Sequence, residues 1–250
     1  MKLSIYPTKD AMSKATADLV VEQILEKPDS LVCFPSGESP LIVLEYLVKY
    51  GLEGRVNFDR CRFVGLDEWL GMDEKNDGSC KYFMHTNFFN PLKIRQENII
   101  FFDGMAADLD EECQKMDQFI KSNGPIDLMI VGLGLNGHIG LNEPGTYFNL
   151  YSHLAELDPL TIQVAQKYFK ETTTLSGGIT LGLKHFTEAK TAVLIVSGTK
   201  KADILKKILE EELSENLPGT IIQSHRNAYV LSDHEAASEL AESTVNQYLS

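Results

Sequence analysis

Basic residues are in short supply in this 250-residue chain, and the shortage excludes two classes of partner. Lysine and arginine number 23 against 36 aspartates and glutamates, so the formal net charge is −13. Nucleic-acid binding needs clustered cations that displace counterions from phosphates, and anionic membrane surfaces attract the same cations. We therefore expect neither a nucleic-acid nor a membrane partner.

The chain also lacks paired cysteines and long apolar runs. Its four cysteines form no Cys-x-x-Cys pair, so their spacing indicates neither a zinc site nor a redox motif, and we expect no metal. No stretch approaches the ~18 apolar residues of a membrane-spanning helix. Residues 1–6 show no apolar core of a signal peptide. A cytoplasmic protein is the expectation.

Internal repeats and flexible linkers are absent as well, which favours a single domain over residues 1–250. Short apolar runs alternate with longer amphipathic stretches. The runs predict buried strands at 31–35, 62–66, 127–132, 192–197 and 228–231, and the amphipathic stretches predict helices near 10–26, 40–50, 106–121 and 200–213. This alternation is typical of a Rossmann-like α/β fold, with a doubly wound, largely parallel sheet and helices on both faces.

Ligands of such sheets bind outside the carboxyl ends of the strands, so the segments that follow the strands are of interest. Residues 36–40 read Ser-Gly-Glu-Ser-Pro and precede a predicted helix, an arrangement that suits a phosphate at the helix N-terminus. The alternative is a serine that simply caps the helix. Next comes Asp67-Glu68, either a candidate for proton transfer or a polar strand terminus.

The most informative segment is Gly132–Gly145, which holds five glycines together with Asn136, His138 and Glu143. Dense glycine beside titratable groups indicates close backbone approach to a ligand, and a carboxylate can orient an imidazole. Three of the glycines match a dinucleotide-binding spacing, but no helical pattern follows. After the fourth strand, Lys201 opens another predicted helix and could reach a phosphate.

These four loops together suit proton transfer on a phosphorylated small molecule. The remaining histidines stand in no ligand spacing, and we interpret them as structural or surface residues: His85, His153, His185, His225 and His234.

The sequence resembles a known family, the hexosamine-6-phosphate deaminases, also called glucosamine-6-phosphate isomerases. The similarity covers nearly the whole chain, and the most specific motif is Gly-Leu-Gly-Leu-Asn-Gly-His-Ile-Gly-Leu-Asn-Glu-Pro at 132–144. Further matching segments are 34–40, 65–69, 81–89, 178–183 and 194–201. Within the family, three segments look most like the galactosamine-6-phosphate isomerase branch: Asp-Glu-Trp at 67–69, Leu-Gly-Leu-Asn-Gly-His-Ile-Gly-Leu-Asn-Glu-Pro-Gly at 133–145 and Gly-Ile-Thr-Leu-Gly-Leu-Lys at 178–184.

The resemblance implies conversion of a 2-amino-2-deoxyhexose 6-phosphate into a ketohexose 6-phosphate and ammonia, with no metal or organic cofactor. By motif, His138 opens the sugar ring, Glu143 orients it, and Asp67 moves a proton from C2 to C1. The phosphate is expected at residues 36–39 and Lys201. This set comprises Ser36, Gly37, Glu38, Ser39 and Lys201. The family includes monomers and hexamers, so a homo-oligomer stays open.

Some positions depart from the family pattern. Asn136 stands where the glucosamine enzymes often carry Asp, and Glu38 replaces a small residue, so we expect the Glu38 side chain to turn away from the phosphate. Lys167 is the nearest equivalent of the family's phosphate-binding Arg. Residues 151–154 lack the basic stretch that serves allosteric control in some members, so we expect no activation by an acetylated sugar phosphate there.

Two alternatives are weighed against this interpretation. A 6-phosphogluconolactonase tends to carry Asp-Glu-Arg and Gly-His-Thr-Ala-Ser-Leu-Phe-Pro, whereas this chain has Trp69 and Glu143. A non-catalytic sugar-phosphate sensor is disfavoured because no helix-turn-helix or basic region accompanies the domain, and because Asp67 and His138 are both present.

Overall fold

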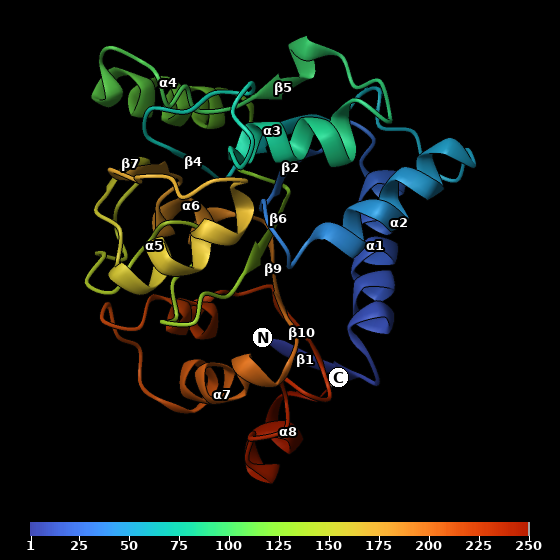
Figure 1. Cartoon of the computed structure of the whole chain (residues 1–250). Coiled ribbons are helices and arrows are strands. Elements are labelled where there is room, and N and C mark those ends of the chain that lie inside the picture. Colours follow the sequence, from blue (N-terminus) through green and yellow to red (C-terminus); the bar gives the residue numbers. More distant parts are fainter. Residues whose placement is uncertain (250) are drawn as a thin grey trace.

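A parallel β-sheet runs through the centre of the molecule, with strands drawn from both ends of the chain (Figure 1). The protein is described by a computed structural model covering residues 1–249. Within this range the sheet has seven strands in the order β1-β10-β9-β6-β2-β3-β5, all parallel to their neighbours. The strands are β1 (Lys2–Tyr6), β2 (Leu31–Phe34), β3 (Arg62–Gly65), β5 (Ile99–Ile100), β6 (Leu128–Gly132), β9 (Thr191–Val196) and β10 (Ala228–Asp233).

Helices cover both faces of this sheet, because successive side chains of each strand point to opposite sides and both sides are apolar. The covering helices are α1 (Lys9–Glu26), α2 (Leu41–Leu52), α4 (Leu109–Asn123), α6 (Leu183–Glu188) and α7 (Ala202–Glu210). On one face, α1, α2 and the π-helical turn His85–Phe89 pack on strand residues such as Val32 and Ile130. On the other, α4, α6 and α7 pack on residues such as Cys33 and Val131. The predicted doubly wound α/β fold is confirmed.

A second, smaller sheet stands beyond the end of β3. It contains β4 (Asp67–Trp69), β8 (Gly178–Thr180) and β7 (His153–Ala155) in the antiparallel order β4-β8-β7. Asp67 stands opposite Thr180 in this register. The chain therefore leaves the main sheet after β3 and enters the small one at Asp67, which carries this carboxylate over the carboxyl ends of the main strands.

The sequence-based elements agree with the structure except at their ends. Helix α4 begins at Leu109 because the Asp108 side chain accepts a hydrogen bond from the Glu111 amide at 2.9 Å and so caps the helix. Helix α7 starts only at Ala202, since Thr199–Lys201 form a 3₁₀ turn, and it ends three residues before the predicted 213.

Several elements were not predicted. The edge strand β1 is one, and the others are the small sheet, β5 and three short helices: α3 (Cys80–Met84), α5 (Pro159–Ala165) and α8 (Glu242–Tyr248). Among residues 1–249, no helix has the length and apolar character needed to cross a membrane.

Candidate active site

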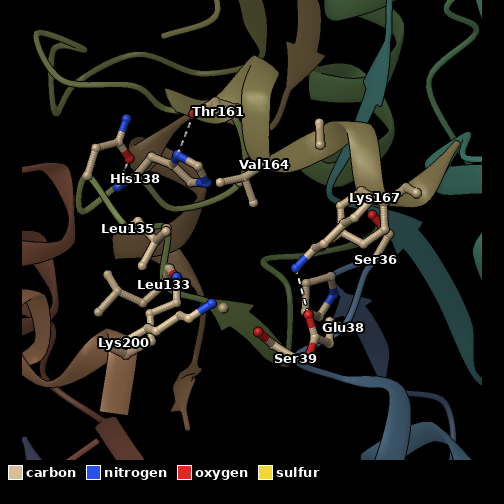
Figure 2. Close-up of a pocket in the computed structure, with 18 of the residues that line it drawn as sticks. Ser36, Glu38, Ser39, Leu133, Leu135, His138, Thr161, Val164, Lys167 and Lys200 are labelled. Carbon is tan, nitrogen blue, oxygen red and sulfur yellow. Dashed lines mark hydrogen bonds and ion pairs between the residues drawn. The ribbon is translucent and has the colours of Figure 1, made fainter. Parts of the chain in front are cut away.

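A cavity of about 1040 Å³ opens at the carboxyl ends of the central strands (Figure 2). Its walls come from the loops that follow β2, β6 and β9, from β4, and from α5 with the 3₁₀ turn Gln166–Tyr168. Of the residues singled out from the sequence, those lining it are Ser36, Glu38, Ser39, Asp67, Asn136, His138, Lys167 and Lys201. The four strand-end loops therefore converge on one cavity, as expected for a sheet of this type.

The loop after β2 brings backbone close to the cavity. Gly37 has a φ of +98°, and a Cβ atom at this position would lie 2.8 Å from Oη of Tyr168, so a glycine is needed here. Helix α2 follows directly, with Pro40 before its first residue and no side chain that caps it. The alternative that a serine of this loop caps the helix is thus wrong. An uncapped helix N-terminus beside a cavity favours an anionic ligand.

Lys201 approaches the same end of the cavity from the turn that precedes α7. Its ammonium group donates a hydrogen bond to the backbone carbonyl of Leu133. Burial lowers the pKa of Lys201 to about 8; the nearby charge of Lys167 lowers it too, whereas Glu38 raises it. An anion bound here would restore the positive charge that burial disfavours.

The sequence predicts that the Glu38 side chain turns away from the phosphate, but in the structure Glu38 lines the cavity. Its carboxylate Oε2 lies 2.6 Å from Nζ of Lys167, and the two labelled side chains lie next to each other on one side of the view in Figure 2. The hydrogen bond and the charge of Lys167 hold the pKa of Glu38 below its ordinary value. The ammonium group within hydrogen-bond reach accounts for this orientation, although a pair with side chains 63% and 46% exposed contributes at most about 1 kcal/mol. Lys167 is therefore engaged by Glu38 in this structure.

Asp67 and Glu68 are neighbours in β4 with different surroundings. Asp67 lines the cavity although only 8% of it is exposed. Burial raises the pKa of Asp67 to about 6, helped by the charge of Glu68 and opposed by a hydrogen bond from Cys80 and by His138. A carboxylate with a pKa this close to neutrality can both accept and return a proton.

Glu68 is fully buried and has a structural role. Oε1 accepts hydrogen bonds from the amides of Trp69 and Cys80 at 2.8 and 3.0 Å. Oε2 accepts from Oγ of Ser79 and the amide of Lys81 at 2.8 and 2.9 Å. Burial still raises the pKa of Glu68, although these bonds oppose it. Its carboxylate thus anchors the start of α3, and of the two acids only Asp67 is available to a ligand.

His138 stands on the other side of the cavity, held by three polar side chains. Its Nδ1 lies 3.3 Å from Oε2 of Glu143 and 3.1 Å from Oγ1 of Thr161. Asn136 donates to the same Glu143 oxygen at 2.8 Å, and its own Oδ1 accepts from the His138 amide at 3.3 Å. Glu143 is buried behind the ring. The predicted pair of imidazole and carboxylate is present, and Asn136 belongs to it.

Glycine at 134 is required by this arrangement. A Cβ atom at Gly134 would lie 2.5 Å from three atoms of the His138 ring, so the imidazole packs directly on the backbone. After β6 the chain forms turns rather than a helix, which agrees with the rejection of a dinucleotide-binding loop.

Functional side chains that the sequence does not single out also line the cavity, among them Thr161, Cys80 and Asp233. Thr161 lies in α5 and carries no local signal. Asp233 had a signal, because it follows the predicted strand 228–231. Both of its carboxylate oxygens accept from the amide of Gly198, at 3.0 and 3.1 Å, which orders the turn before Lys201.

Two of the remaining histidines have structural roles. Nε2 of His185 is 2.7 Å from Asp117, and Nε2 of His225 is 2.9 Å from the carbonyl of Ala189. Within residues 1–249, no group of three or more His, Cys, Asp or Glu side chains is placed to hold a metal ion.

Comparison with known proteins agrees with this geometry. The model of the family described as glucosamine-6-phosphate isomerases/6-phosphogluconolactonase matches residues 7–231. The chain belongs to this glucosamine-6-phosphate isomerase/6-phosphogluconolactonase family. A glucosamine-6-phosphate deaminase of Thermoanaerobacter sp. (strain X514) is 36% identical over 239 residues, which are 95% of this chain and 94% of that protein.

Two solved structures show the same architecture as this chain. That of a monomeric glucosamine-6-phosphate deaminase matches with a TM-score of 0.93 at 31% identity, covering 96% of this chain and 100% of the other. A 6-phosphogluconolactonase from Trypanosoma brucei matches with a TM-score of 0.75 at 16% identity, over 96% of this chain and 98% of the other. The second likeness is one of fold alone.

Proposed function

We propose that this protein is an amino-sugar 6-phosphate deaminase that converts a 2-amino-2-deoxyhexose 6-phosphate into a ketohexose 6-phosphate and ammonia. One observation carries the proposal: Asp67 and His138, the latter backed by Glu143, face a single cavity that is also lined by Ser36, Glu38, Ser39 and Lys201. The similarity to glucosamine-6-phosphate deaminases along nearly the whole chain supports it.

His138 serves ring opening. The reaction on the pyranose needs a proton removed from the O1 hydroxyl and a proton delivered to O5, and one imidazole between these atoms can do both. Glu143 and Thr161 hold Nδ1, so the other ring nitrogen, which faces the cavity in Figure 2, is left for the sugar. The products of this step are the C1 aldehyde and a free C5 hydroxyl.

Asp67 then carries the isomerisation. Its carboxylate takes the C2 proton, and the electron pair of the C–H bond forms the C1–C2 double bond of an enolamine as O1 is protonated. The same carboxyl returns the proton to C1, which leaves a C2 iminium ion. Water adds at C2 and ammonia departs, giving the ketose. One base suffices because C1 and C2 are adjacent and are approached from the same face.

The phosphate end is the other half of the site. The α2 N-terminus and Lys201 offer positive potential to a dianion although the chain carries a net charge of −13. A 6-phosphate held there leaves the sugar ring to reach toward Asp67 and His138.

For the sugar, we propose galactosamine 6-phosphate as the preferred C4 epimer. The basis is the sequence at 67–69 and 178–184, which resembles that branch of the family. These two segments pair as β4 and β8, so they belong to one structural unit beside the cavity. A hydroxyl that is bonded in only one epimer can discriminate strongly.

Ammonia release from galactosamine 6-phosphate and glucosamine 6-phosphate tests the proposal, with wild type and Asp67→Asn. We expect release by wild type, a higher kcat/KM on the galactosamine epimer, and a loss of about 10²-fold or more in Asp67→Asn. Release from neither epimer, with hydrolysis of 6-phosphogluconolactone, would contradict the deaminase. Full activity of Asp67→Asn would contradict the assignment of the base.

A further inference from the structure

Cys80 is a buried side chain at the cavity wall that the mechanism above does not use. It is the first residue of α3, it is 4% exposed, and it lines the cavity together with Asp67. Both residues lie on rigid elements. Strand β4, which contains Asp67, is paired with β8, and the first turn of α3 donates backbone hydrogen bonds to the Glu68 carboxylate.

Glu68 fixes the position of Cys80 relative to Asp67. Its carboxylate binds the Cys80 amide, and it also binds the residues on either side, Ser79 and Lys81. Glu68 directly follows Asp67 in β4, so the first turn of α3 is locked against the residue next to Asp67. The Cys80 side chain therefore has little freedom to leave the carboxylate it faces.

The Cys80 thiol has two polar neighbours. It lies beside the Asp67 carboxylate and the hydroxyl of Ser36, between the base and the loop after β2. Burial raises the pKa of the Cys80 thiol well above its ordinary value, and the charge of Asp67 adds to this. The thiol stays protonated at every pH at which the enzyme would work, and it remains a donor.

We propose that Cys80 is a positioning residue, whose thiol donates a hydrogen bond that holds the Asp67 carboxylate ionised and oriented toward the reacting carbons. The inference deepens the proposed function and rests on its assignment of Asp67 as the base. A fixed donor matters here because a carboxylate in a buried site has few other ways to stay charged.

The other groups that act on Asp67 define what happens without the thiol. Glu68 from the same strand raises the pKa of Asp67, and His138 from the loop after β6 lowers it. Cys33 in β2 is fully buried, and burial raises the pKa of its thiol well above the ordinary value, so it stays neutral. Without the Cys80 thiol, burial and the charge of Glu68 raise the pKa of Asp67, and of these groups only His138 lowers it. Asp67 therefore keeps its proton to a higher pH.

The test compares Cys80→Ala and Cys80→Ser with wild type over pH 5 to 9, measuring ammonia release from both hexosamine 6-phosphates. In Cys80→Ala we expect the acidic midpoint of the kcat/KM profile to rise by about 0.5–1 pH unit. Below the midpoint that lowers kcat/KM by about three- to tenfold, and on the alkaline plateau the loss is smaller. The hydroxyl of Cys80→Ser restores the donor and returns the midpoint toward that of wild type.

Cys113→Ala is the matched control. Cys113 is equally buried, at 6% exposed, but it lies in α4 and does not line the cavity. Its loss should leave the midpoint unchanged. A fall of activity by the same factor at every pH in both Cys80→Ala and Cys80→Ser, without a shift of the midpoint, would overturn the proposal and make Cys80 a packing residue.

A second measurement separates this proposal from the proposed function. The carboxyl resonance of ¹³C-labelled Asp67, assigned by its absence in Asp67→Asn, is titrated in the protein without substrate. We expect the Asp67 pKa to be higher in Cys80→Ala than in wild type, and restored in Cys80→Ser. Failure of wild type to release ammonia would contradict the deaminase, whereas an unchanged titration in Cys80→Ala would contradict the role of Cys80.

Discussion

Oε2 of Glu143 lies 3.3 Å from Nδ1 of His138, and this contact fixes which ring nitrogen is free. The Glu143 carboxylate is buried, which by itself raises its pKa. The bond and charge of His138, with hydrogen bonds from Thr161 and Asn136, outweigh that and lower the pKa of Glu143 below its ordinary value. The carboxylate therefore stays ionised behind the ring, where it can stabilise an imidazolium as His138 takes up a proton.

Glu143→Gln should consequently slow the proposed reaction by about tenfold to a hundredfold in kcat, a part of the ~10²–10⁴-fold that positioned acid–base groups contribute. KM should change little, because Glu143 lies behind His138 and does not line the cavity. The measurement is steady-state ammonia release. Glu188→Gln is a suitable control, since Glu188 bonds the exposed Tyr151 hydroxyl outside the cavity. An unchanged kcat in Glu143→Gln would contradict the role of the pair.

The part of this site that could be predicted lies at strand ends. The loops with Ser36, His138 and Lys201 each follow a strand whose apolar run is visible in the sequence, and parallel strands deliver their carboxyl ends to one edge. The local sequence pattern and the general topology of parallel sheets are therefore enough to predict that these loops lie together.

What could not be predicted depends on contacts between distant parts of the chain. The sequence predicts a single strand at 62–66, yet the chain forms a second strand, β4, which leaves the main sheet to pair with β8, more than 100 residues later. Likewise, the sequence predicts that Glu38 turns away from the phosphate, because only the fold brings Lys167, 129 residues later, next to its carboxylate. Thr161 contacts His138 only because α5 folds over the cavity. None of these pairings leaves a periodic or spaced signal.

The ion pair of Glu38 and Lys167 leads to a prediction about binding. The Glu38 carboxylate binds the Lys167 ammonium group and places a negative charge near the expected phosphate. A dianion must therefore compete with Glu38 for Lys167. In Glu38→Gln we expect KM for the sugar phosphate to fall severalfold with kcat nearly unchanged. The same variant should bind inorganic phosphate more tightly, measured by calorimetry.

Glu45→Gln provides the control for Glu38→Gln, since it removes the same charge from an exposed position on α2. Long-range charge is screened over about 8 Å at physiological salt, so this variant should have almost no effect. A KM that rises in Glu38→Gln would mean that the Glu38 carboxylate contributes to substrate binding.

Asp127 supports the opposite end of the sheet and predicts a stability effect. Its buried carboxylate accepts hydrogen bonds from Lys27 at 2.5 Å, Lys190 at 2.8 Å and the Leu31 amide at 2.8 Å. Asp127→Asn removes the charge that these donors share and should cost about 1.5–3 kcal/mol in the free energy of unfolding. Urea denaturation followed by circular dichroism measures it. Asp18→Asn, which alters an exposed pair with Lys14, should cost less than about 1 kcal/mol.

The pH dependence of this effect has a defined sign. Burial raises the pKa of Asp127, but its bonds to Lys190, Lys27 and Leu31 prevail and lower it below the ordinary value. The folded state therefore binds this proton less readily than the unfolded state does, so the stabilisation is complete at neutral pH. It is lost as pH falls below the ordinary aspartate pKa of about 4 and through the folded value. The difference in stability between wild type and Asp127→Asn should shrink over the same acidic range.

Lys201 predicts a loss of binding at alkaline pH. Burial lowers its pKa to about 8 in the ligand-free site, so the protonated form that attracts a phosphate is lost as the pH rises above that value. The dissociation constant of inorganic phosphate should then increase by up to about tenfold per pH unit above 8. Lys201→Arg should flatten this dependence, because a guanidinium keeps its charge.

Lys201→Ala should raise KM by about tenfold or more and lower kcat less, since the phosphate is remote from C1 and C2. A phosphate affinity that does not change between pH 7 and 9.5 in wild type would mean that the Lys201 ammonium does not bind the anion. The α2 N-terminus and Lys167 would then have to hold it, in a chain whose net charge of −13 offers no long-range attraction.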